Sequence, residues 1–211
     1  KKPVENQFQD LRSLAARVAN CRTEVRLNRR LAREIYLGVV PITREASGGL
    51  ALAGEGDVVD WLVHMRRLPA DCMLDQIILN GEADEQETRD RLARLANSLV
   101  EFYRDAPVAG LTGQDYVQLF EQEQAKNRAV LKEPRFARDL GSLDDLLARF
   151  DDSLAAVRGE LEQRVRDGRI VDGHGDLRPE HVCLVDPPVV IDCLEFSERL
   201  RMIDSFDELV Y

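Results

Sequence analysis

Apolar residues recur every three or four positions in several stretches of the chain, the spacing of a helix that packs on one side. The first stretch runs from about residue 10 to residue 32, and two more follow residue 69. The clearest stripe comes after Ser142 and contains Leu143, Leu147, Phe150, Leu154, Val157, Leu161 and Val165. The sequence predicts a helix over each stretch.

The last of these helices carries signals for both of its ends. Ser142 is a residue type that caps helix N-termini, and Asp144 and Asp145 fall in the positive first turn. Gly168 follows the last apolar position and is predicted to end the helix. The stripe covers barely three heptads, which favours a helix packed inside a domain over a coiled coil.

β-Branched and aromatic residues gather in two other stretches, "YLGVVPITR" (36–44) and "DVVDWLVHMRRLP" (57–69), on either side of the glycine-rich "SGGLALAGEG" (47–56). This is the pattern of a strand, a turn and a strand. Three short β-like pieces come later, "RIV", "HVCLV" and "VVID", and the tail from about Ile203 is helical. We therefore predict an α+β protein with a small α/β lobe over residues 1–69 and a larger, mainly helical lobe over residues 70–211 that carries a short hairpin.

Composition narrows the functional class. The chain has 29 basic and 39 acidic residues and a formal net charge of -10, which argues against a general nucleic-acid binder. No apolar run approaches the length of a membrane-spanning helix, and the four cysteines show no paired spacing, as expected for reduced thiols in a cytoplasmic protein. The chain begins at "KKPV" and ends at "DELVY", so we expect a fragment of a longer protein.

Candidate chemistry is concentrated in "VDGHGDLRPEHVCLVDPPVVIDCLEF" (171–196). Asp176 follows one short strand and Asp192 ends another, so the two carboxylates are predicted to face one cleft. Phosphoryl transfer needs this arrangement, with one carboxylate to accept the proton of a hydroxyl and another to hold Mg²⁺. The alternatives are ordinary turn residues, or a zinc site of His174, His181 and Cys183, whose spacing matches no common zinc signature.

The strings "HGDLRPEHVCL" and "VVIDCLEF" resemble the catalytic loop (174–184) and the metal-binding segment (189–196) of aminoglycoside phosphotransferases and choline-kinase-like enzymes. The resemblance covers nearly the whole chain. It implies a protein-kinase-like two-lobe fold, ATP and Mg²⁺ as cofactors, and a small-molecule hydroxyl acceptor. The chain is most similar to a bacterial group in which this domain is often fused to a P-loop ATPase domain.

The resemblance also implies roles for residues of the predicted larger lobe. Asp176 would be the catalytic base, and His174 would brace the catalytic loop. Asp192 would hold the metal ion. Asp207 would accept hydrogen bonds from the catalytic-loop backbone.

In the smaller lobe, the resemblance implies a nucleotide site. Glu24 would pair with the lysine that contacts the phosphates, for which Lys1 and Lys2 are the candidates. Met65 and Arg66 lie in the stretch from 64 to 69 that looks like the hinge, whose backbone would meet the adenine.

The chain departs from the family pattern in two ways. His181 stands where the family has an asparagine that binds the second metal ion, so metal binding would rest on Asp192, with Glu195 as a substitute and Mn²⁺ as an alternative to Mg²⁺. The glycine-rich phosphate-covering hairpin is absent. His181 in place of the asparagine motivates a second hypothesis, a catalytically weak nucleotide-binding module that controls a fused ATPase domain. The acceptor stays open.

Overall fold

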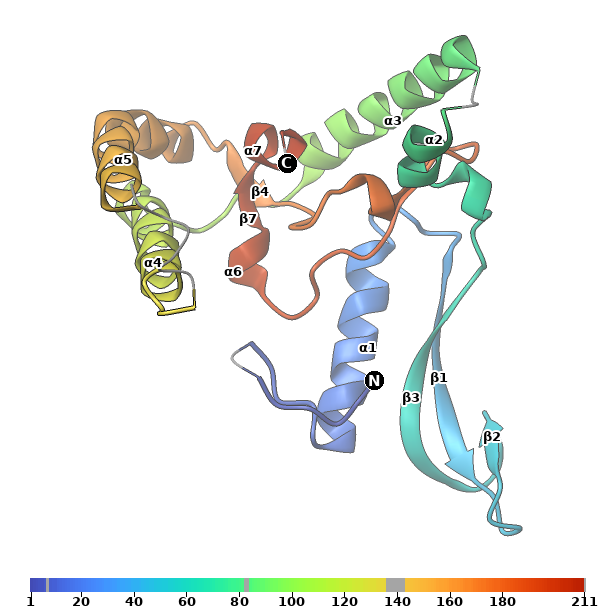
Figure 1. Ribbon diagram of the computed structural model, residues 1–211. Coiled ribbons are helices and arrows are strands. Elements are labelled where there is room, and N and C mark those ends of the chain that lie inside the picture. Colours follow the sequence, from blue (N-terminus) through green and yellow to red (C-terminus); the bar gives the residue numbers. More distant parts are fainter. Residues whose placement is uncertain (7, 82–83, 136–142, 211) are drawn as a thin grey trace. The chain divides into compact units, whose positions relative to one another are not determined.

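The computed structural model describes residues 1–6, 8–81, 84–135 and 143–210. The chain forms two compact units, one made of Lys1–Ala106 and Asp172–Tyr211, the other of Pro107–Val171 (Figure 1). Each unit is described by itself. All the residues with a predicted role in catalysis or binding belong to the first unit.

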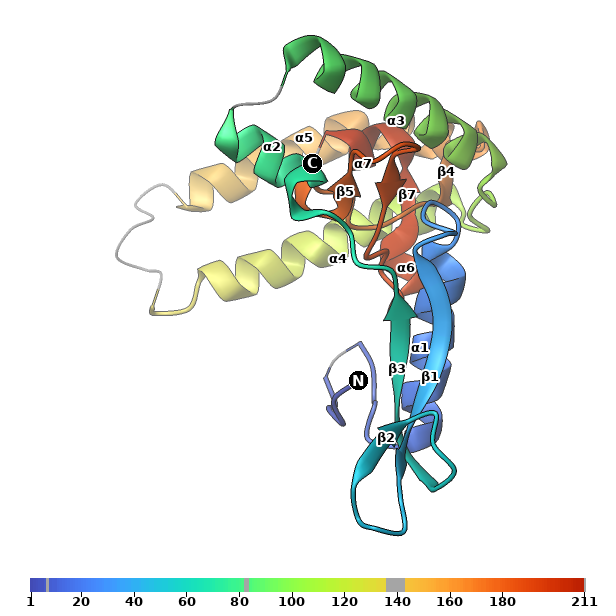
Figure 2. The same ribbon diagram turned by 90° about the vertical axis from the view of Figure 1, so that its right-hand side faces the viewer.

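The N-terminal part of the first unit is a helix packed on a small antiparallel sheet. Its elements are α1 (Leu14–Asn28), β1 (Tyr36–Arg44), β2 (Leu50–Leu52) and β3 (Asp57–Met65), with the strand order β2-β1-β3. Ser13 caps α1 by accepting a hydrogen bond from the backbone of Ala16. Figure 2 shows α1 running along β1 and β3.

The rest of the first unit consists of short elements joined by ordered loops. They are a 3-10 turn η1 (Ala70–Cys72), α2 (Leu74–Asn80), α3 (Glu85–Asp105), η2 (Pro179–His181), β5 (Val182–Cys183), β6 (Val189–Val190), α6 (Glu198–Arg201), β7 (Met202–Asp204) and α7 (Ser205–Leu209). β5 and β6 pair in antiparallel fashion. This hairpin separates the segments that carry Asp176 and Asp192, and it therefore brings them back toward each other.

Two apolar clusters hold these pieces together. One contains Leu95 and Leu99 of α3 with Val182, Leu184 and Val190 of the hairpin region. The other contains Val25, Ala32, Ile35 and Tyr36, against which Val189 and Ile191 pack. Because Val189 and Val190 contribute to different clusters, the short strand β6 connects the α1 region with the α3 region immediately before Asp192.

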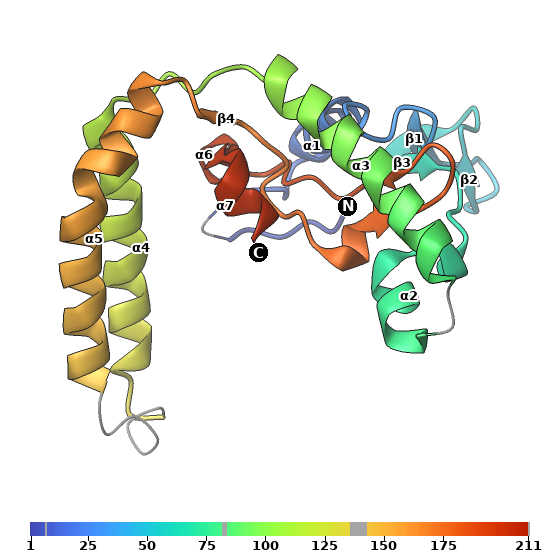
Figure 3. The ribbon, with the colours of Figure 1, turned by 90° about the horizontal axis from the view of Figure 1, so that it is seen from above.

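The second unit is an antiparallel pair of helices, α4 (Gly113–Leu131) and α5 (Leu143–Arg166), which lie side by side in Figure 3. Thr112 and Asp115 form a reciprocal capping box at the start of α4. Lys132 pairs with Asp144 across the ends of the two helices at 3.0 Å. Gly168, with a φ of +67°, ends the second helix. The short strand β4 (Ile170–Asp172) follows it.

Several predictions from the pattern are confirmed: the protein is a mixed α/β structure, the strands over 36–44 and 57–65 are present, and α1, α3, α4 and α5 lie in the predicted stretches. The prediction of a plain turn over 47–56 was wrong, because residues 50–52 pair with the edge of β1. The capping residue proposed at 142 lies outside the described residues. The two-lobe division at residue 69 stays a prediction. Among the described helices, none has the length and apolar character needed to cross a membrane.

Candidate functional site

The HGD loop, residues 174–176, has a backbone conformation that requires glycine at its central position. Gly175 has a φ of +86°, in the left-handed region that residues with a Cβ avoid. A Cβ at this position would also lie 3.0 Å from side-chain atoms of both Arg201 and Leu194. The loop therefore turns sharply at residue 175 and presents the carboxylate of Asp176.

His174 is buried and both of its ring nitrogens contact the backbone. Its Nε2 lies 2.9 Å from the carbonyl oxygen of Ile191, and its Nδ1 accepts a hydrogen bond of 3.3 Å from the amide of Asp176. A carbonyl can only accept, so Nε2 carries the proton. Burial lowers the pKa of His174 to about 4. A neutral His174 thus links the catalytic loop to the segment that precedes Asp192.

Asp176 is held by an arginine that the pattern did not single out. Arg178 donates from Nη2 to Oδ2 of Asp176 at 3.1 Å, and its Nε lies 2.9 Å from Oδ1. Both carboxylate oxygens are therefore engaged by one guanidinium group. The side chains of Asp176 and Arg178 are 26% and 39% exposed, so a ligand from solvent can reach this pair.

His181 contacts both candidate carboxylate residues. Its Nδ1 lies 2.7 Å from the backbone carbonyl oxygen of Asp176, and its Nε2 lies 3.3 Å from Oδ2 of Asp192. The ring also lies within 3.3 Å of Nη2 of Arg178. Asp176 and Asp192 thus share one neighbour, although 15 residues separate them in the sequence.

Asp192 has an unusual backbone. Its φ is +64°, which is rare for a residue with a side chain, although Asp and Asn tolerate it better than most. The amide of Asp192 donates to the hydroxyl of buried Tyr36 at 3.2 Å. Burial raises the pKa of Tyr36, so the hydroxyl stays protonated. The carboxylate of Asp192 is 64% exposed, as a group that meets a ligand requires.

Lys1, rather than Lys2, faces Glu24. Its Nζ lies 2.6 Å from Oε2 of Glu24 and 2.9 Å from Oε1 of Glu195, whereas Lys2 is exposed. Burial acts to lower the pKa of Lys1, but the two carboxylates outweigh it and the pKa is raised. Burial raises the pKa of Glu24 despite the lysine. The structure therefore joins Lys1, Glu24 and Glu195 in one ion-paired group, and Glu195 is engaged there.

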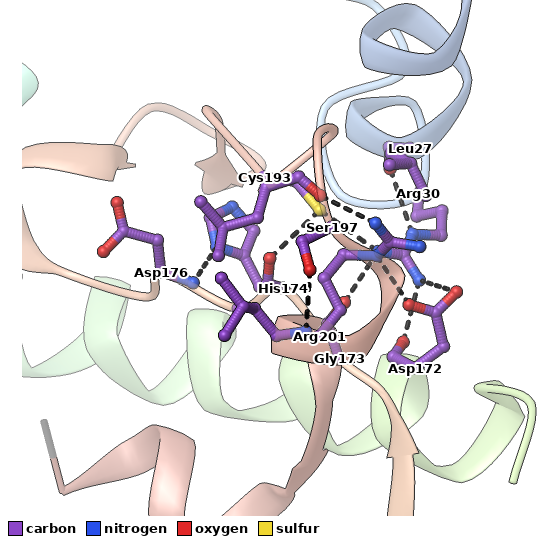
Figure 4. Close-up of polar contacts among 12 residues, drawn as sticks. Leu27, Arg30, Asp172, Gly173, His174, Asp176, Cys193, Ser197 and Arg201 are labelled. Atoms are coloured by element: carbon purple, nitrogen blue, oxygen red, sulfur yellow. Dashed lines mark hydrogen bonds and ion pairs between the residues drawn. The ribbon is translucent and has the colours of Figure 1, made fainter. Parts of the chain in front are cut away.

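A partly buried polar network ties the end of α1 to the segment that leads into the HGD loop (Figure 4). Arg30 donates to the carbonyl oxygens of Asp172 and Gly173 at 2.8 and 2.7 Å. Arg201 donates to Oδ1 of Asp172 at 2.7 Å. The thiol of Cys193 donates to the carbonyl oxygen of His174 at 3.1 Å. The loops before Asp176 and after Asp192 are thus fixed to the same helix end.

The acceptor of the catalytic-loop amides is Glu208, and the prediction for Asp207 was wrong by one position. Buried Glu208 accepts hydrogen bonds from the amides of His174 and Gly175 and from the hydroxyl of Tyr103, the last at 2.6 Å. Asp207 is exposed. In the five-residue helix α7, only position 208 points its carboxylate at the loop.

A small cavity of about 210 Å³ adjoins the catalytic loop. Its lining includes Asp176, Leu177, Ile203, Asp207 and Glu208. Asp207 therefore has a place at the site, at the wall of this cavity. Asp176 and Glu208 in this lining already have partners within the protein, and the exposed Asp207 adds a carboxylate that can attract a positively charged group.

The two residues predicted to lie in a hinge, Met65 and Arg66, have structural contacts of their own. Met65 pairs with Tyr36 across the sheet and packs against the cluster around it. The amide of Arg66 donates to the carbonyl oxygen of Ile35 at 2.9 Å. That amide is engaged within the protein, so any contact with adenine would involve other backbone atoms of residues 64–69.

In the described part of the chain, no group of three or more His, Cys, Asp or Glu side chains is arranged to hold a metal ion. The alternative zinc site is not formed, because both nitrogens of His174 contact the backbone. His181 and Asp192 are adjacent, whereas Glu195 pairs with Lys1. A metal ion at this site would need further ligands from a bound substrate, and nucleotide phosphates supply such oxygens.

Sequence reasoning missed Glu208, Arg178, Arg30, Tyr103 and Arg201. Arg178 lies only two residues after Asp176, and this short spacing between a cation and a carboxylate is a signal that the sequence does contain. Glu208 contacts the loop, Arg30 and Arg201 contact the residues just before it, and Tyr103 contacts Glu208. Each of these contacts spans more than 25 positions, and a single sequence carries no signal for such pairings.

Comparison with known proteins gives relatives without an assigned role. The chain is 31% identical over 217 residues to the uncharacterized protein Rv2004c of Mycobacterium tuberculosis and, with the same figures, to the uncharacterized protein Mb2027c of Mycobacterium bovis. Each alignment covers 100% of the chain and 40% of the relative, so the chain spans well under half the length of these proteins. No family model matches the sequence. No solved structure matches it either.

Proposed function

We propose that this chain carries the core of an ATP-dependent phosphotransferase of protein-kinase-like, two-lobe fold, which moves the γ-phosphate to a hydroxyl group of a small molecule. One observation carries the proposal: His181 contacts Asp176 through a backbone carbonyl and Asp192 through a carboxylate, at 2.7 and 3.3 Å. A candidate proton acceptor and a candidate cation ligand therefore lie on the two sides of one imidazole ring, and phosphoryl transfer uses one group of each kind.

Asp176 would accept the proton of the acceptor hydroxyl. As the hydroxyl oxygen forms its bond to the γ-phosphorus, the bond from that phosphorus to the oxygen of ADP breaks, and the proton passes to the carboxylate. Arg178 must release at least one oxygen of Asp176 for this to happen. Once released from Asp176, the guanidinium group of Arg178 can bind phosphate oxygens instead.

The nucleotide side of the site would be formed by Lys1 and Asp192. Lys1 is held by Glu24 and Glu195 at 2.6 and 2.9 Å, which orients its ammonium group and keeps it charged. A divalent cation bound with the nucleotide would neutralise phosphate charge during transfer. Asp192 and His181 are the residues placed to hold it, and the exposed carboxylate of Asp192 fits this role.

The acceptor side of the site would be the small cavity next to Asp176. Its volume of about 210 Å³ holds only part of a drug-sized molecule. The exposed carboxylate of Asp207 in its lining favours an acceptor with a positive charge near the reacting hydroxyl. Aminoglycosides are one class of that kind.

The test is nucleotide binding by calorimetry with and without a divalent cation, followed by a phosphate-transfer screen over amine-bearing alcohols. Asp176→Asn should abolish transfer and leave nucleotide binding nearly unchanged, since it removes the proton acceptor alone. Asp186→Asn is the matched control, because its side chain is 82% exposed in the turn of the β5–β6 hairpin. Absence of nucleotide binding by the full-length protein would contradict the proposal.

Arg178 contacts both carboxylate oxygens of Asp176, which would hinder Asp176 from accepting a proton. This contact favours a second candidate function, a nucleotide-binding module of low activity that regulates an attached ATPase domain. The two candidates differ in their response to Arg178→Gln. If Arg178 restrains Asp176, turnover rises in the variant. If Arg178 binds phosphate during transfer, turnover falls and the affinity for nucleotide weakens.

A further inference from the structure

His181 has one ring nitrogen fixed by the protein and the other turned toward a carboxylate. Nδ1 lies 2.7 Å from the carbonyl oxygen of Asp176, and a carbonyl oxygen can only accept a hydrogen bond. The proton of a neutral ring is therefore on Nδ1. Nη2 of Arg178, which can only donate, lies 3.3 Å from Nε2. Both neighbours of the ring thus select the same tautomer, with a lone pair on Nε2.

This lone pair lies next to a negatively charged group. Oδ2 of Asp192 is 3.3 Å from Nε2. Two electron-rich atoms at this separation repel each other unless a proton or a cation lies between or beside them. The guanidinium group of Arg178 meets that need in part. A nitrogen lone pair and a carboxylate oxygen that converge in this way are the usual protein ligands of a transition-metal ion.

The separation of the two atoms fits coordination to one ion. Adjacent ligands of an octahedral divalent cation lie about 3 Å apart, because each is about 2.1 Å from the metal. The backbone contact on Nδ1 also matches the outer hydrogen bond that orients metal-binding histidines. The side chain of His181 is 9% exposed, so the ring is held in place before a ligand arrives.

We propose that His181 Nε2 and Asp192 Oδ2 form a mixed nitrogen and oxygen site that selects Mn²⁺ over Mg²⁺ for the nucleotide complex. The inference rests on the proposed function, because nucleotide phosphates must supply the remaining ligands. Mg²⁺ strongly prefers oxygen donors, whereas an imidazole nitrogen shifts the preference toward first-row transition metals. With only two protein ligands, the site binds the ion together with the nucleotide and only weakly without it.

The experiment measures the ion and its ligands directly. The protein is loaded with Mn²⁺ and the β,γ-methylene analogue of ATP, which has no nitrogen beside the phosphates. Pulsed electron paramagnetic resonance then reports nitrogen and phosphorus nuclei coupled to the ion. Calorimetry gives the affinity for the same nucleotide with Mn²⁺ and with Mg²⁺.

In the wild-type protein we expect phosphorus coupling together with ¹⁴N coupling, and the ¹⁴N signal should be replaced by that of ¹⁵N when the histidines are ¹⁵N-labelled. His181→Asn, which exchanges the nitrogen ligand for an amide oxygen, should lose this signal. It should also reduce the preference for Mn²⁺ over Mg²⁺ by about tenfold or more. Asp186→Asn is the matched control, since the side chain of Asp186 is 82% exposed in the turn of the β5–β6 hairpin, and it should change nothing.

Three results separate the inference from the function on which it rests. Phosphorus coupling without nitrogen coupling in the wild-type protein overturns the mixed site and leaves the proposed function standing. An equal preference for Mn²⁺ over Mg²⁺ in the wild-type protein and in His181→Asn likewise overturns the mixed site and leaves the proposed function standing. Absence of cation-dependent nucleotide binding in the wild-type protein overturns both. The wild-type spectrum alone is decisive if His181→Asn does not fold.

Discussion

Acidification should destabilise this protein through His174. Its pKa is lowered from 6.5 to about 4 by burial of a ring that is 1% exposed. The unfolded chain binds a proton near pH 6.5, whereas the folded protein binds it only near pH 4. Unfolding therefore takes up a proton between these values, and the contribution present above pH 6.5 is lost as the pH falls.

The magnitude follows from the size of the shift. Each pKa unit corresponds to about 1.4 kcal/mol, so the full effect at low pH is about 3 kcal/mol. Between about pH 7 and pH 5, where the folded state stays neutral, the free energy of unfolding should fall by about 2 kcal/mol through this residue. That is a large share of the stability of an ordinary domain.

Urea denaturation of the wild-type protein and two variants at both pH values isolates this contribution from the carboxylates that titrate nearby. His174→Gln keeps a donor for the carbonyl oxygen of Ile191 but has no titrating ring. It should be less stable at pH 7 and should lose about 2 kcal/mol less than the wild-type protein on acidification. His64→Gln, at an exposed position, should match the wild-type loss. Parallel losses in the wild-type protein and His174→Gln would refute the reasoning.

Three further changes test the anchoring of the loop, each by urea denaturation. Glu208→Gln should lower the free energy of unfolding by about 2–3 kcal/mol, because an amide side chain cannot accept hydrogen bonds from all the donors around Glu208. Asp207→Asn should change it by no more than about 0.5 kcal/mol, and equal effects of the two substitutions would contradict the assignment. Tyr103→Phe should cost about 1 kcal/mol through the lost hydrogen bond, and a neutral effect would mean that Glu208 does not need it. Gly175→Ala should destabilise the protein more than Gly48→Ala, because the φ values are similar, +86° and +84°, but only a Cβ at residue 175 would meet close neighbours. An equal loss of about 1 kcal/mol in both variants would mean that backbone strain alone accounts for the effect.

The hydrophobic and polar pattern predicted those helices and strands whose conformation is determined by their own residues. β-Branched residues are dense enough in 36–44 that the strand was predicted with its observed limits, Tyr36 and Arg44. The strand at 50–52 was missed because three residues flanked by glycines are too few to show a strand pattern. Its strand conformation comes from pairing with residues 42–44 of β1. Pairing between segments is a property of the folded chain, and local pattern does not encode it.

The same limit explains the outcome at the site. His174, Asp176 and Asp192 could be singled out as candidates because a short contiguous string carries them. Which acidic residue reaches the loop, 207 or 208, depends on the rotation of a five-residue helix about its axis. Periodicity cannot fix that rotation in so short a helix. The choice between Lys1 and Lys2 likewise depends on a contact with Glu24 across more than 20 positions, which only the structure provides.

His174 and His181 show how position decides chemistry between residues of one type. Both rings have a nitrogen fixed by a backbone carbonyl, at 2.9 and 2.7 Å. In His174 the second nitrogen also meets the backbone, through the amide of Asp176, so no lone pair faces solvent or a ligand and the ring can only join segments. In His181 the second nitrogen meets the carboxylate of Asp192 and a guanidinium group instead. The lone pair of that second nitrogen already faces a cation, the guanidinium group of Arg178, whereas both nitrogens of His174 are held by the backbone. His181 rather than His174 is therefore the histidine whose substitution should change the metal preference proposed above.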